Sequence, residues 1–475
     1  MILLCPSLPP PSRESPKNPE IPRKGINACS MSVSFSITKE DMPTTETTLI
    51  FKRRFRQDFA GTLIVQGGLM GIGAFTGICA ARLLGPHGRG ELAALTLWPL
   101  VLIMLASLGI NQAIVFYTGK QSYSLSELWT ASTLIGFVQS LCVVLVGVFV
   151  IPLALRDYSP GIEHLALAFL FAAPFLMMSG YPGNLLQGRL ELRSFNLIRM
   201  IPSLVYALGL AVLLVLGRAD LRDVVFSQIL GYVLAVAAGY SILQRKEKLR
   251  FSMNAMLLKS MFGFGWRTQL GTVTSYINQR IDQLLLSLFV NPLDLGLYVV
   301  AVTVSTALGF FPQALAIVTL ARGSNLPPAQ ARAFIGRAFR TSLIWQVVSC
   351  SALFVVAPGL IRFVFGSKFT GSGIACRILL PGSIALGLNQ VLYEGARSLN
   401  EPALPAYTEG FASLITCGGL YVLLPRIGFV GAAIASTLAY TASLIFMLTL
   451  YKFRLRMDLH DLLGITTVPR SARRY

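Results

Sequence analysis

The chain has 475 residues, of which 54% are hydrophobic and only 13% are charged. An average soluble domain is about 25% charged, so this chain has too few charges to cover the surface of a soluble protein. The mean hydropathy of +0.65 and the repeated long apolar runs instead indicate many membrane-spanning helices. A net charge of +19 in a soluble protein would suggest nucleic-acid binding. In a membrane protein it marks the cytoplasmic loops, and we expect no nucleic-acid partner.

The first fifty residues differ in composition from the rest. Residues 1–50 contain eight prolines and little hydrophobic periodicity, which predicts a disordered N-terminal tail. The apolar run at the start is too short for a signal peptide and has no charged segment before it. Met31 and Met42 are alternative starts that would shorten the tail ahead of the basic cluster at 52–56.

From residue 57 onward, apolar segments follow one another at regular intervals. Each is long enough to cross about 30 Å of hydrocarbon as a helix. They predict an all-α integral membrane protein with about twelve spans, of which the seventh is unusually polar. The predicted spans are 59–81, 91–118, 127–154, 162–187, 194–216, 222–243, 261–289, 295–320, 341–365, 374–396, 403–424 and 429–451.

The basic residues predict an orientation. An even number of spans puts both termini on the same side of the membrane. Basic residues near the edge of a span are counted with the nearer loop. With that rule, 29 of the 40 Lys and Arg residues fall on the side of the termini. Nine fall on the other side, and the remaining two, Arg267 and Arg280, lie inside the seventh span. Because Lys and Arg concentrate in cytoplasmic loops, both termini, including a tail at 457–475, are predicted to be cytoplasmic.

The two halves of the chain repeat each other. Pro86 and Gly90 in LLGPHGRGELAAL correspond to Pro292 and Gly296 in LFVNPLDLGLYVV, an offset of 206 residues. Two more matches, Gly188 with Gly395 and GLAVLL with GLYVLL, follow at nearly the same offset. A repeat that crosses six spans preserves orientation, so we expect two pseudo-symmetric six-helix lobes, at 51–245 and 251–456. A transporter with a cavity between the lobes is one interpretation, and duplication without transport is the other.

Three stretches resemble a known family. The stretches ARLLGPHGRGELAAL, LGINQAIVFYTGK and FGWRTQLGTVTSYINQRIDQLLLSLFVNPLDLGLYVVA are similar to the oligosaccharide-lipid flippases of the MOP superfamily, and the resemblance covers roughly 55–455. It implies MATE-like lobes around a cavity that opens alternately to either side of the bacterial cytoplasmic membrane. It also implies that the cargo is an undecaprenyl-diphosphate-linked oligosaccharide for O-antigen, capsule or exopolysaccharide. We expect no cofactor and no enzymatic activity, with other polysaccharide-assembly membrane proteins as candidate partners.

The seventh predicted span carries most of the polar chemistry. A charge at the centre of a membrane helix costs about 2.5–3.5 kcal/mol on insertion scales, so its charged residues need a wet cavity or close partners. Guanidinium groups suit a diphosphate because they donate paired hydrogen bonds to phosphate oxygens. An internal Arg–Asp pair, and a snorkelling side chain for Arg267, are the structural alternatives. The candidate cavity residues are Arg267, Thr274, Asn278, Arg280 and Asp282.

Two later carboxylates are candidates for ion coupling. Glu409 lies inside the eleventh predicted span without an obvious local partner, and it could carry H⁺ or Na⁺. Glu394 is a second candidate, although Arg397 three residues later could simply pair with it.

Two other function classes stay open. A MATE-like cation-coupled drug or metabolite antiporter would share the fold. The resemblance implies that drug exporters of the superfamily often carry a carboxylate in the first lobe, so the absence of any acidic residue from the first span, 59–81, argues against this class. A membrane polysaccharide polymerase or ligase would usually carry a large outer loop, whereas all the predicted outer loops are short. No P-loop is present, and the His and Cys residues lack the spacing of a metal site, so we expect no metal.

Overall fold

The computed structural model describes residues 45–218 and 220–464, and among these the side chains of 45–60, 62, 63, 267, 268, 270–272, 274 and 275 are not described. The predicted tail at 1–50 and the alternative starts therefore lie almost wholly outside the described residues. The chain divides into two units after Arg54, and the second unit, Phe55–Tyr475, contains the helices from residue 55 of the first helix onward.

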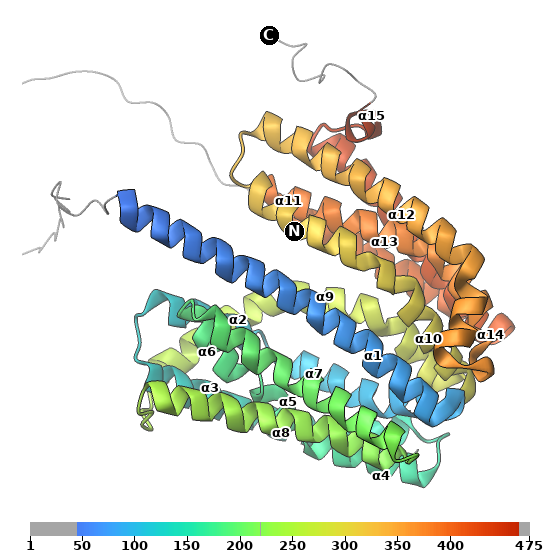
Figure 1. Cartoon of the computed structure of the whole chain (residues 1–475), viewed down its shortest axis with the longest axis horizontal. Helices are drawn as coiled ribbons and strands as arrows, with labels where there is room; N and C mark the ends of the chain where they lie inside the picture. Colours follow the sequence, from blue (N-terminus) through green and yellow to red (C-terminus); the bar gives the residue numbers. More distant parts are fainter. Residues whose placement is uncertain (1–44, 219, 465–475) are drawn as a thin grey trace, which may run out of the picture. The chain divides into compact units, whose positions relative to one another are not determined.

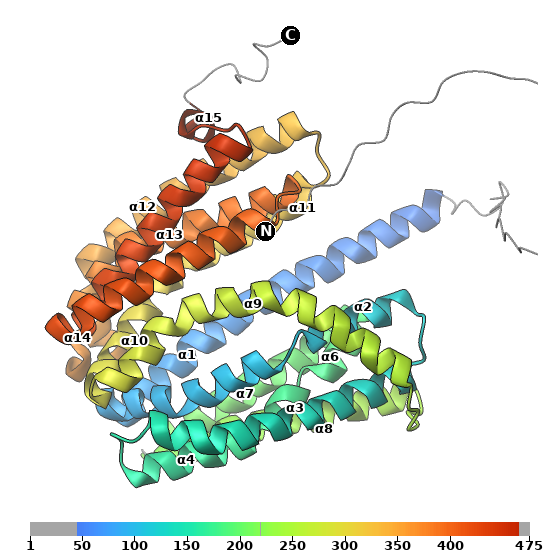
Figure 2. The ribbon, with the colours of Figure 1, turned by 180° about the vertical axis from the view of Figure 1, so that it is seen from behind.

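Most of the described residues lie in helices, which are joined by short connecting segments (Figures 1 and 2). The elements are α1 (Thr45–Ala106), α2 (Ile110–Lys120), α3 (Leu125–Ala154), α4 (Pro160–Phe171), α5 (Ala173–Met178), α6 (Tyr181–Gly188), α7 (Leu192–Val215), α8 (Leu221–Lys246), α9 (Ala255–Phe289), α10 (Pro292–Thr306), η2 (Ala307–Gly309), α11 (Phe310–Gly323), α12 (Pro328–Phe365), η3 (Ser367–Phe369), α13 (Ser372–Ser398), α14 (Ala403–Arg454) and α15 (Leu459–Leu463).

The prediction of an all-helical membrane protein is confirmed. Eight helical segments among the described residues are long and apolar enough to cross a membrane, or nine if the bent stretch from α4 to α6 is one span. In addition, α1 breaks at Gly85 and α14 breaks at Gly428, both with positive φ. α14 contains the two predicted spans 403–424 and 429–451, whereas α1 contains the span 59–81 and the first part of the span 91–118, which continues into α2. α9 covers the polar seventh span. The number twelve stays a prediction.

The helices of this unit fall into two groups by their contacts. α7 packs on α6 and α8 in one group, while α13 packs on α11, α12 and α14 in the other. α9 contacts both groups, as Figure 2 shows. Near its start Phe264 stacks on Phe116 of α2, and near its end Asp282 accepts a hydrogen bond from Tyr298 of α10. The lobes at 51–245 and 251–456 remain predictions, and α9 belongs by contact to both groups.

The buried apolar residues show that the two groups meet at one end. The largest cluster joins residues of α1, α3 to α5, α7 and α8 to residues of α9, α10 and α12 to α14. Two smaller clusters lie toward the opposite end. One is built from α2, α3 and α6 to α9, and the other from α12 to α15. We call the first end the crossing end, and the opposite one, where residues 247–254 join α8 to α9, the linker end.

Glycines allow the close contact at the crossing end. A Cβ atom on Gly90 of α1 would overlap the carbonyl oxygen of Pro292, and one on Gly296 of α10 would overlap that of Pro86. The contact is reciprocal between the residues that the sequence repeat pairs. Small residues matter here because helices in a bilayer associate through close packing rather than through the hydrophobic effect.

Hydrogen bonds from an arginine of α1 to α12 also stabilise the crossing end. The guanidinium of Arg82 in α1 donates to the carbonyl oxygens of Phe363 and Val364, at 2.7 and 2.6 Å, in the last turn of α12. The last carbonyls of a helix lack partners within it, and its C-terminal end attracts a cation. Arg82 therefore ties α1 to a helix of the second group.

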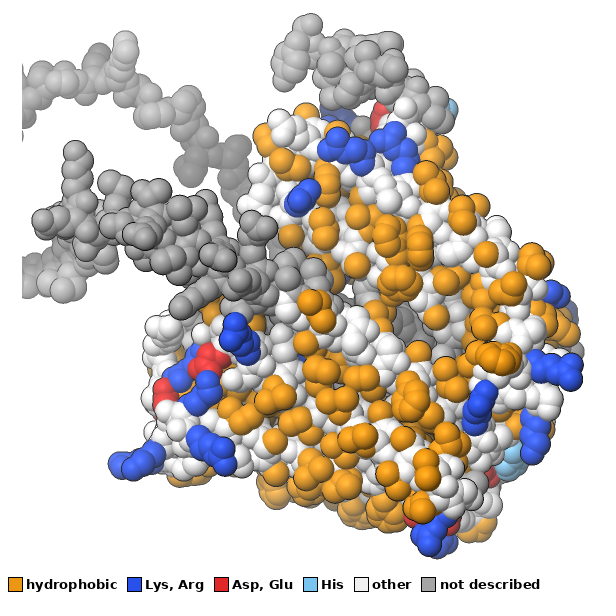
Figure 3. Space-filling model, viewed as in Figure 1, with side chains coloured by type: hydrophobic (Ala, Val, Ile, Leu, Met, Phe, Trp, Pro, Cys, Tyr) orange, Lys and Arg blue, Asp and Glu red, His pale blue; other side chains and the backbone are white. Residues whose placement is uncertain are grey.

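The surface has the pattern of a protein in a bilayer. Apolar side chains cover the middle of the face in Figure 3, and Lys and Arg gather toward its margins. Large apolar residues that face outward include Phe149, Val215 and Tyr421, whose exposed fractions are 79%, 86% and 85%. Such side chains would be costly in water and are stable against lipid tails.

Candidate functional site: a cationic cavity

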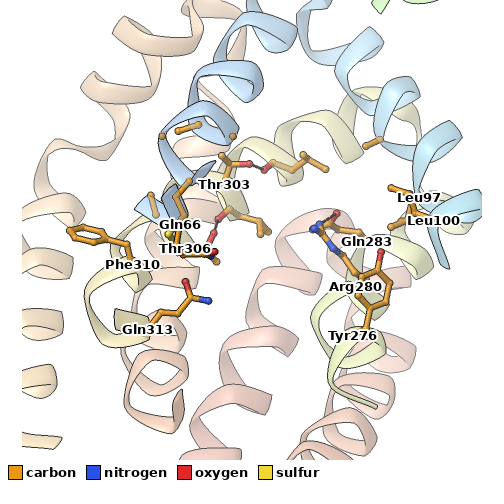
Figure 4. A pocket seen from close by; sticks show the side chains of 18 of the residues that line it. Gln66, Leu97, Leu100, Tyr276, Arg280, Gln283, Thr303, Thr306, Phe310 and Gln313 are labelled. Atoms are coloured by element: carbon orange, nitrogen blue, oxygen red, sulfur yellow. Dashed lines mark hydrogen bonds between the residues drawn. The ribbon is translucent and has the colours of Figure 1, made fainter. Parts of the chain in front are cut away.

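A cavity of about 990 Å³ lies between the two groups of helices (Figure 4). Both halves of α1 contribute to its wall, as do α9, α10, η2 and α11. Polar side chains are spread over this wall, and its described residues include two arginines and no carboxylate. The polar and charged lining residues are Gln66, Arg89, Thr96, Tyr276, Arg280, Gln283, Thr303, Thr306 and Gln313.

Arg280 of α9 points into this cavity. Its Nη1 donates a 3.2 Å hydrogen bond to Oε1 of Gln283, one turn further along the helix. Figure 4 shows Arg280, Gln283 and Tyr276 on one wall, with Thr306, Phe310 and Gln313 across the space. The Gln283 bond holds the guanidinium toward the open volume and leaves donors free for an anion.

Arg89 is a second cation in the wall, although its position in the sequence predicted an outer loop. It lies in the first turn after the break of α1 at Gly85. Its Nε is buried and has no hydrogen-bond partner among the described residues. Arg89 and Arg280 line the same cavity, so their like charges repel each other. The signal available in the sequence was Pro86: proline favours the first turn of a helix, so the arginine that follows sits inside a helix rather than in a loop.

A third arginine, Arg199 of α7, lies near the linker end. Its Nη2 donates a 2.7 Å hydrogen bond to Oε1 of Gln66, which lines the cavity. Arg199 falls within the predicted span 194–216, near its edge, and both it and Gln66 are polar residues inside predicted spans, which favours hydrogen bonds between helices. The spacing did not indicate that the two residues are partners. Arg199 adds positive charge beside the cavity.

The predicted residues Asn278 and Asp282 face away from this cavity. The carboxylate of Asp282 is buried and accepts hydrogen bonds from Tyr298 Oη at 2.5 Å, Ser436 Oγ at 3.5 Å and the backbone nitrogen of Gln283 at 2.7 Å. No salt bridge joins Arg280 to Asp282 within the described part of the chain. Two residues apart on a helix, the two side chains point in nearly opposite directions.

Asn278 meets the predicted coupling residue Glu409. Its Nδ2 donates to the carboxylate of Glu409 on α14, and its Oδ1 accepts from Ser413 Oγ at 3.2 Å. The side chain of Glu409 is buried. Sequence reasoning selected both residues but did not foresee that they are partners.

The remaining predicted residues lie elsewhere. Glu394 pairs with Arg397 three residues later, as the structural alternative expected, and it does not line the described cavity. Arg267 and Thr274 belong to α9, but their side chains lie outside the described residues. Arg280 is thus the one predicted cavity residue that the structure describes in the cavity wall.

Comparison with known families identifies the chain. A family model described as "Polysaccharide biosynthesis protein" matches residues 79–373, which is more than half of the chain. The chain belongs to this family. Its match includes the crossing glycines, Arg89 and Arg280.

One relative of the chain is named as a flippase of glycan biosynthesis. The chain is 24% identical over 285 residues to the probable low-salt glycan biosynthesis flippase Agl15 of Haloferax volcanii, covering 59% of this chain and 58% of that protein. The match therefore spans less than two thirds of the relative's length.

Two solved structures share the fold. The lipid II flippase MurJ, in an inward closed conformation, matches with a TM-score of 0.71 at 17% identity over 85% of this chain and 89% of that one. A multidrug resistance MATE family transporter of the MOP superfamily, in an inward-facing conformation, matches with a TM-score of 0.69 at 13% identity over 86% and 100%. At these identities the likeness concerns the fold alone.

Proposed function

We propose that this protein is a flippase that moves a lipid-diphosphate-linked oligosaccharide across the cytoplasmic membrane for polysaccharide biosynthesis. The observation that carries the proposal is that Arg89 and Arg280 both line the cavity, and that none of the described lining residues is a carboxylate. Two neighbouring cations inside a membrane protein repel each other and lose hydration, so an anion is needed to balance them. A diphosphate supplies that anion.

The geometry also supports a mechanism of alternating access. The cavity lies beyond the closed crossing end, and the basic residues predict that the linker end faces the cytoplasm. The head group would enter from that side, where Arg199 adds positive charge, while an undecaprenyl tail stays in the bilayer. Arg89 and Arg280 would then hold the diphosphate while the helix groups reorient and the crossing end opens. The process makes and breaks no covalent bond, so the protein is not an enzyme in this proposal.

Ion coupling is a finer part of the proposal. Glu409 is buried in contact with Asn278 of α9, the same helix that presents Arg280 to the cavity. A carboxylate that binds and releases H⁺ or Na⁺ at this contact would change the packing of α9. Because α9 lines the cavity, this change would favour opening of the cavity toward one side of the membrane over the other. Glu394 is the weaker candidate because Arg397 already neutralises it.

Reconstituted protein tests the proposal. Proteoliposomes receive undecaprenyl-diphosphate carrying a fluorescent neutral oligosaccharide, and an impermeant quencher reports its movement between leaflets. We expect Arg89→Gln and Arg280→Gln each to slow flipping at least about tenfold, because each loses charge-assisted hydrogen bonds worth about 1.5–3 kcal/mol. Arg156→Gln is the matched control, because Arg156 is exposed, pairs with the exposed Asp157 beside it and does not line the cavity.

The same preparation separates the other function classes. Flipping at the wild-type rate by both cavity variants would remove the proposed role of the arginines. Exchange of cationic drugs against H⁺ or Na⁺ without flipping would favour the MATE-like antiporter. Lengthening of the oligosaccharide in the presence of the lipid-linked donor would instead favour a polymerase or ligase.

A further inference from the structure

A second cavity, of about 210 Å³, adjoins the cationic one. Leu100 of α1 and Tyr276 of α9 line both cavities, so these two residues form the boundary between them. We call the smaller cavity the side chamber. It is lined by Leu100, Ile103, Met104, Ser107, Asn111, Leu176, Met177, Tyr181 and Tyr276.

A break between α1 and α2 creates the side chamber. Leu108 and Gly109 take positive φ values of 44° and 68°, which interrupt the helix and free its last carbonyl groups. Gln269 of α9 donates to the Met104 carbonyl at 2.7 Å and to Ser107 Oγ at 2.9 Å. Gln139 of α3 donates to the Ser107 carbonyl at 3.3 Å. Side chains from two other helices thus hold the break in place, and the chamber is a built feature of the fold.

The chemistry of the side chamber differs from that of the cationic cavity. None of its lining residues carries a charge, and their polar groups are the hydroxyls of Ser107, Tyr181 and Tyr276 and the amide of Asn111. Asn111 is exposed, and its orientation is fixed because its Oδ1 accepts a 2.7 Å hydrogen bond from Asn184. Its amide nitrogen makes no hydrogen bond to another described residue. Such a site favours a neutral ligand with an apolar face and hydroxyl groups at its edge.

The position of the chamber connects it to the diphosphate. Tyr276 precedes Arg280 by four residues, so it lies one turn, about 6 Å, closer to the linker end on the same face of α9. A sugar attached to a diphosphate at Arg280 is within reach of Tyr276, because the two side chains are one helical turn apart and line the same cavity. The side chamber is the next space beyond that ring.

We propose that the side chamber is a sugar subsite, which holds an uncharged sugar of the lipid-linked head group while the arginines hold the diphosphate. This inference rests on the proposed function. It assigns recognition of the glycan to Asn111 and Tyr276, and recognition of the charge to Arg89 and Arg280. Selection between cargos would then depend on the chamber and not on the cationic cavity.

A binding experiment tests the subsite without requiring transport. Affinities of the detergent-solubilised protein are measured for undecaprenyl-diphosphate with and without a neutral oligosaccharide. We expect wild-type protein to prefer the glycosylated lipid, and Asn111→Leu to reduce that preference about tenfold or more. Met177→Phe narrows the chamber from the facing helix, leaves the Asn111–Asn184 hydrogen bond in place, and should act in the same way.

Two controls make the outcome decisive. Gln112→Leu is the matched variant, because Gln112 is the exposed neighbour of Asn111 and does not line the chamber. Arg280→Gln should weaken binding of both lipids and leave the preference between them intact. Full retention of the preference in both Asn111→Leu and Met177→Phe, or its absence in wild-type protein, would overturn the subsite. A normal preference without flipping would contradict the proposed function alone.

Discussion

Arg280 and Asp282 are two positions apart on α9, and their side chains lie in different environments. Arg280 faces the cavity, whereas Asp282 faces Tyr298 and Ser436 in the second group of helices. A buried carboxylate needs such donors because leaving a charge without partners in low dielectric is costly. The Asp282 cluster therefore supports the packing that positions Arg280, and it need not touch cargo to matter.

Tyr298→Phe tests this supporting role. The substitution removes the 2.5 Å hydrogen bond to the carboxylate of Asp282 and keeps the shape of the ring. We expect a loss of about 1–3 kcal/mol in the free energy of unfolding, the usual cost of an unsatisfied buried polar group. Thermal unfolding in detergent measures it as a lower melting temperature. Tyr421→Phe, at an outward-facing ring that is 85% exposed, is the control and should leave the melting temperature unchanged.

Glu409→Gln tests coupling at the same scale. The amide keeps the size of the side chain but cannot carry a charge or exchange a proton. If Glu409 is the coupling site, flipping by this variant becomes independent of an imposed H⁺ or Na⁺ gradient, while binding of the glycosylated lipid persists. Glu394→Gln should retain the gradient dependence, because that carboxylate pairs with Arg397. A gradient response in Glu409→Gln equal to that of wild-type protein would remove the role.

At the scale of elements, the reciprocal contact of α1 and α10 closes the crossing end. Gly90 and Gly296 each approach the backbone of the other helix so closely that no Cβ atom fits. The hydrogen bonds from Arg82 to the end of α12 add a second attachment at this end. Any state that opens the cavity toward the crossing end must separate these contacts.

Gly90→Ala should shift the protein toward the state that is open at the crossing end. The added methyl group pushes α1 away from the carbonyl of Pro292, so the closed arrangement loses stability relative to the open one. In a cysteine-free background, a cysteine at the cavity position Thr303 should react faster with an impermeant thiol reagent added at the face of the crossing end. Gly309→Ala is the control, because nothing lies within 4 Å of its added Cβ. Equal labelling of the two variants would contradict this role for the crossing.

At the scale of the whole molecule, the distribution of basic residues and the closed crossing end together predict the side of the membrane from which the cargo enters. In the predicted twelve-span topology most Lys and Arg residues fall on the side of the termini, and the large apolar cluster closes the opposite end. A C-terminal epitope tag should accordingly be accessible to antibody only after the cytoplasmic membrane is permeabilised. Accessibility of the tag in intact spheroplasts would reverse the predicted orientation and the direction of entry proposed for the cargo.

The sequence by itself determined the properties that depend on local composition and spacing, namely the membrane class, the helix positions and the repeat. Apolar runs predicted the membrane class and most helix positions, because a helix that crosses a bilayer needs about 20 apolar residues wherever it packs. The repeat singled out Gly90 and Gly296, since close helix contacts require small residues at fixed positions. The resemblance in the same stretches pointed to the family that the comparison then showed.

Only the tertiary structure decided which polar residues share a space. Spacing placed Asn278 and Asp282 on one face of α9, but the partner of that face is set by the packing of α14, more than 120 residues away. Arg89 was predicted in a loop and Arg199 near the edge of a span, and the distance of a residue from a span edge does not show whether it lies at a cavity between distant helices. The side chamber likewise depends on a helix break held by Gln139 and Gln269. Helix formation is encoded locally, whereas the direction of a buried side chain is fixed by contacts between segments far apart in the chain.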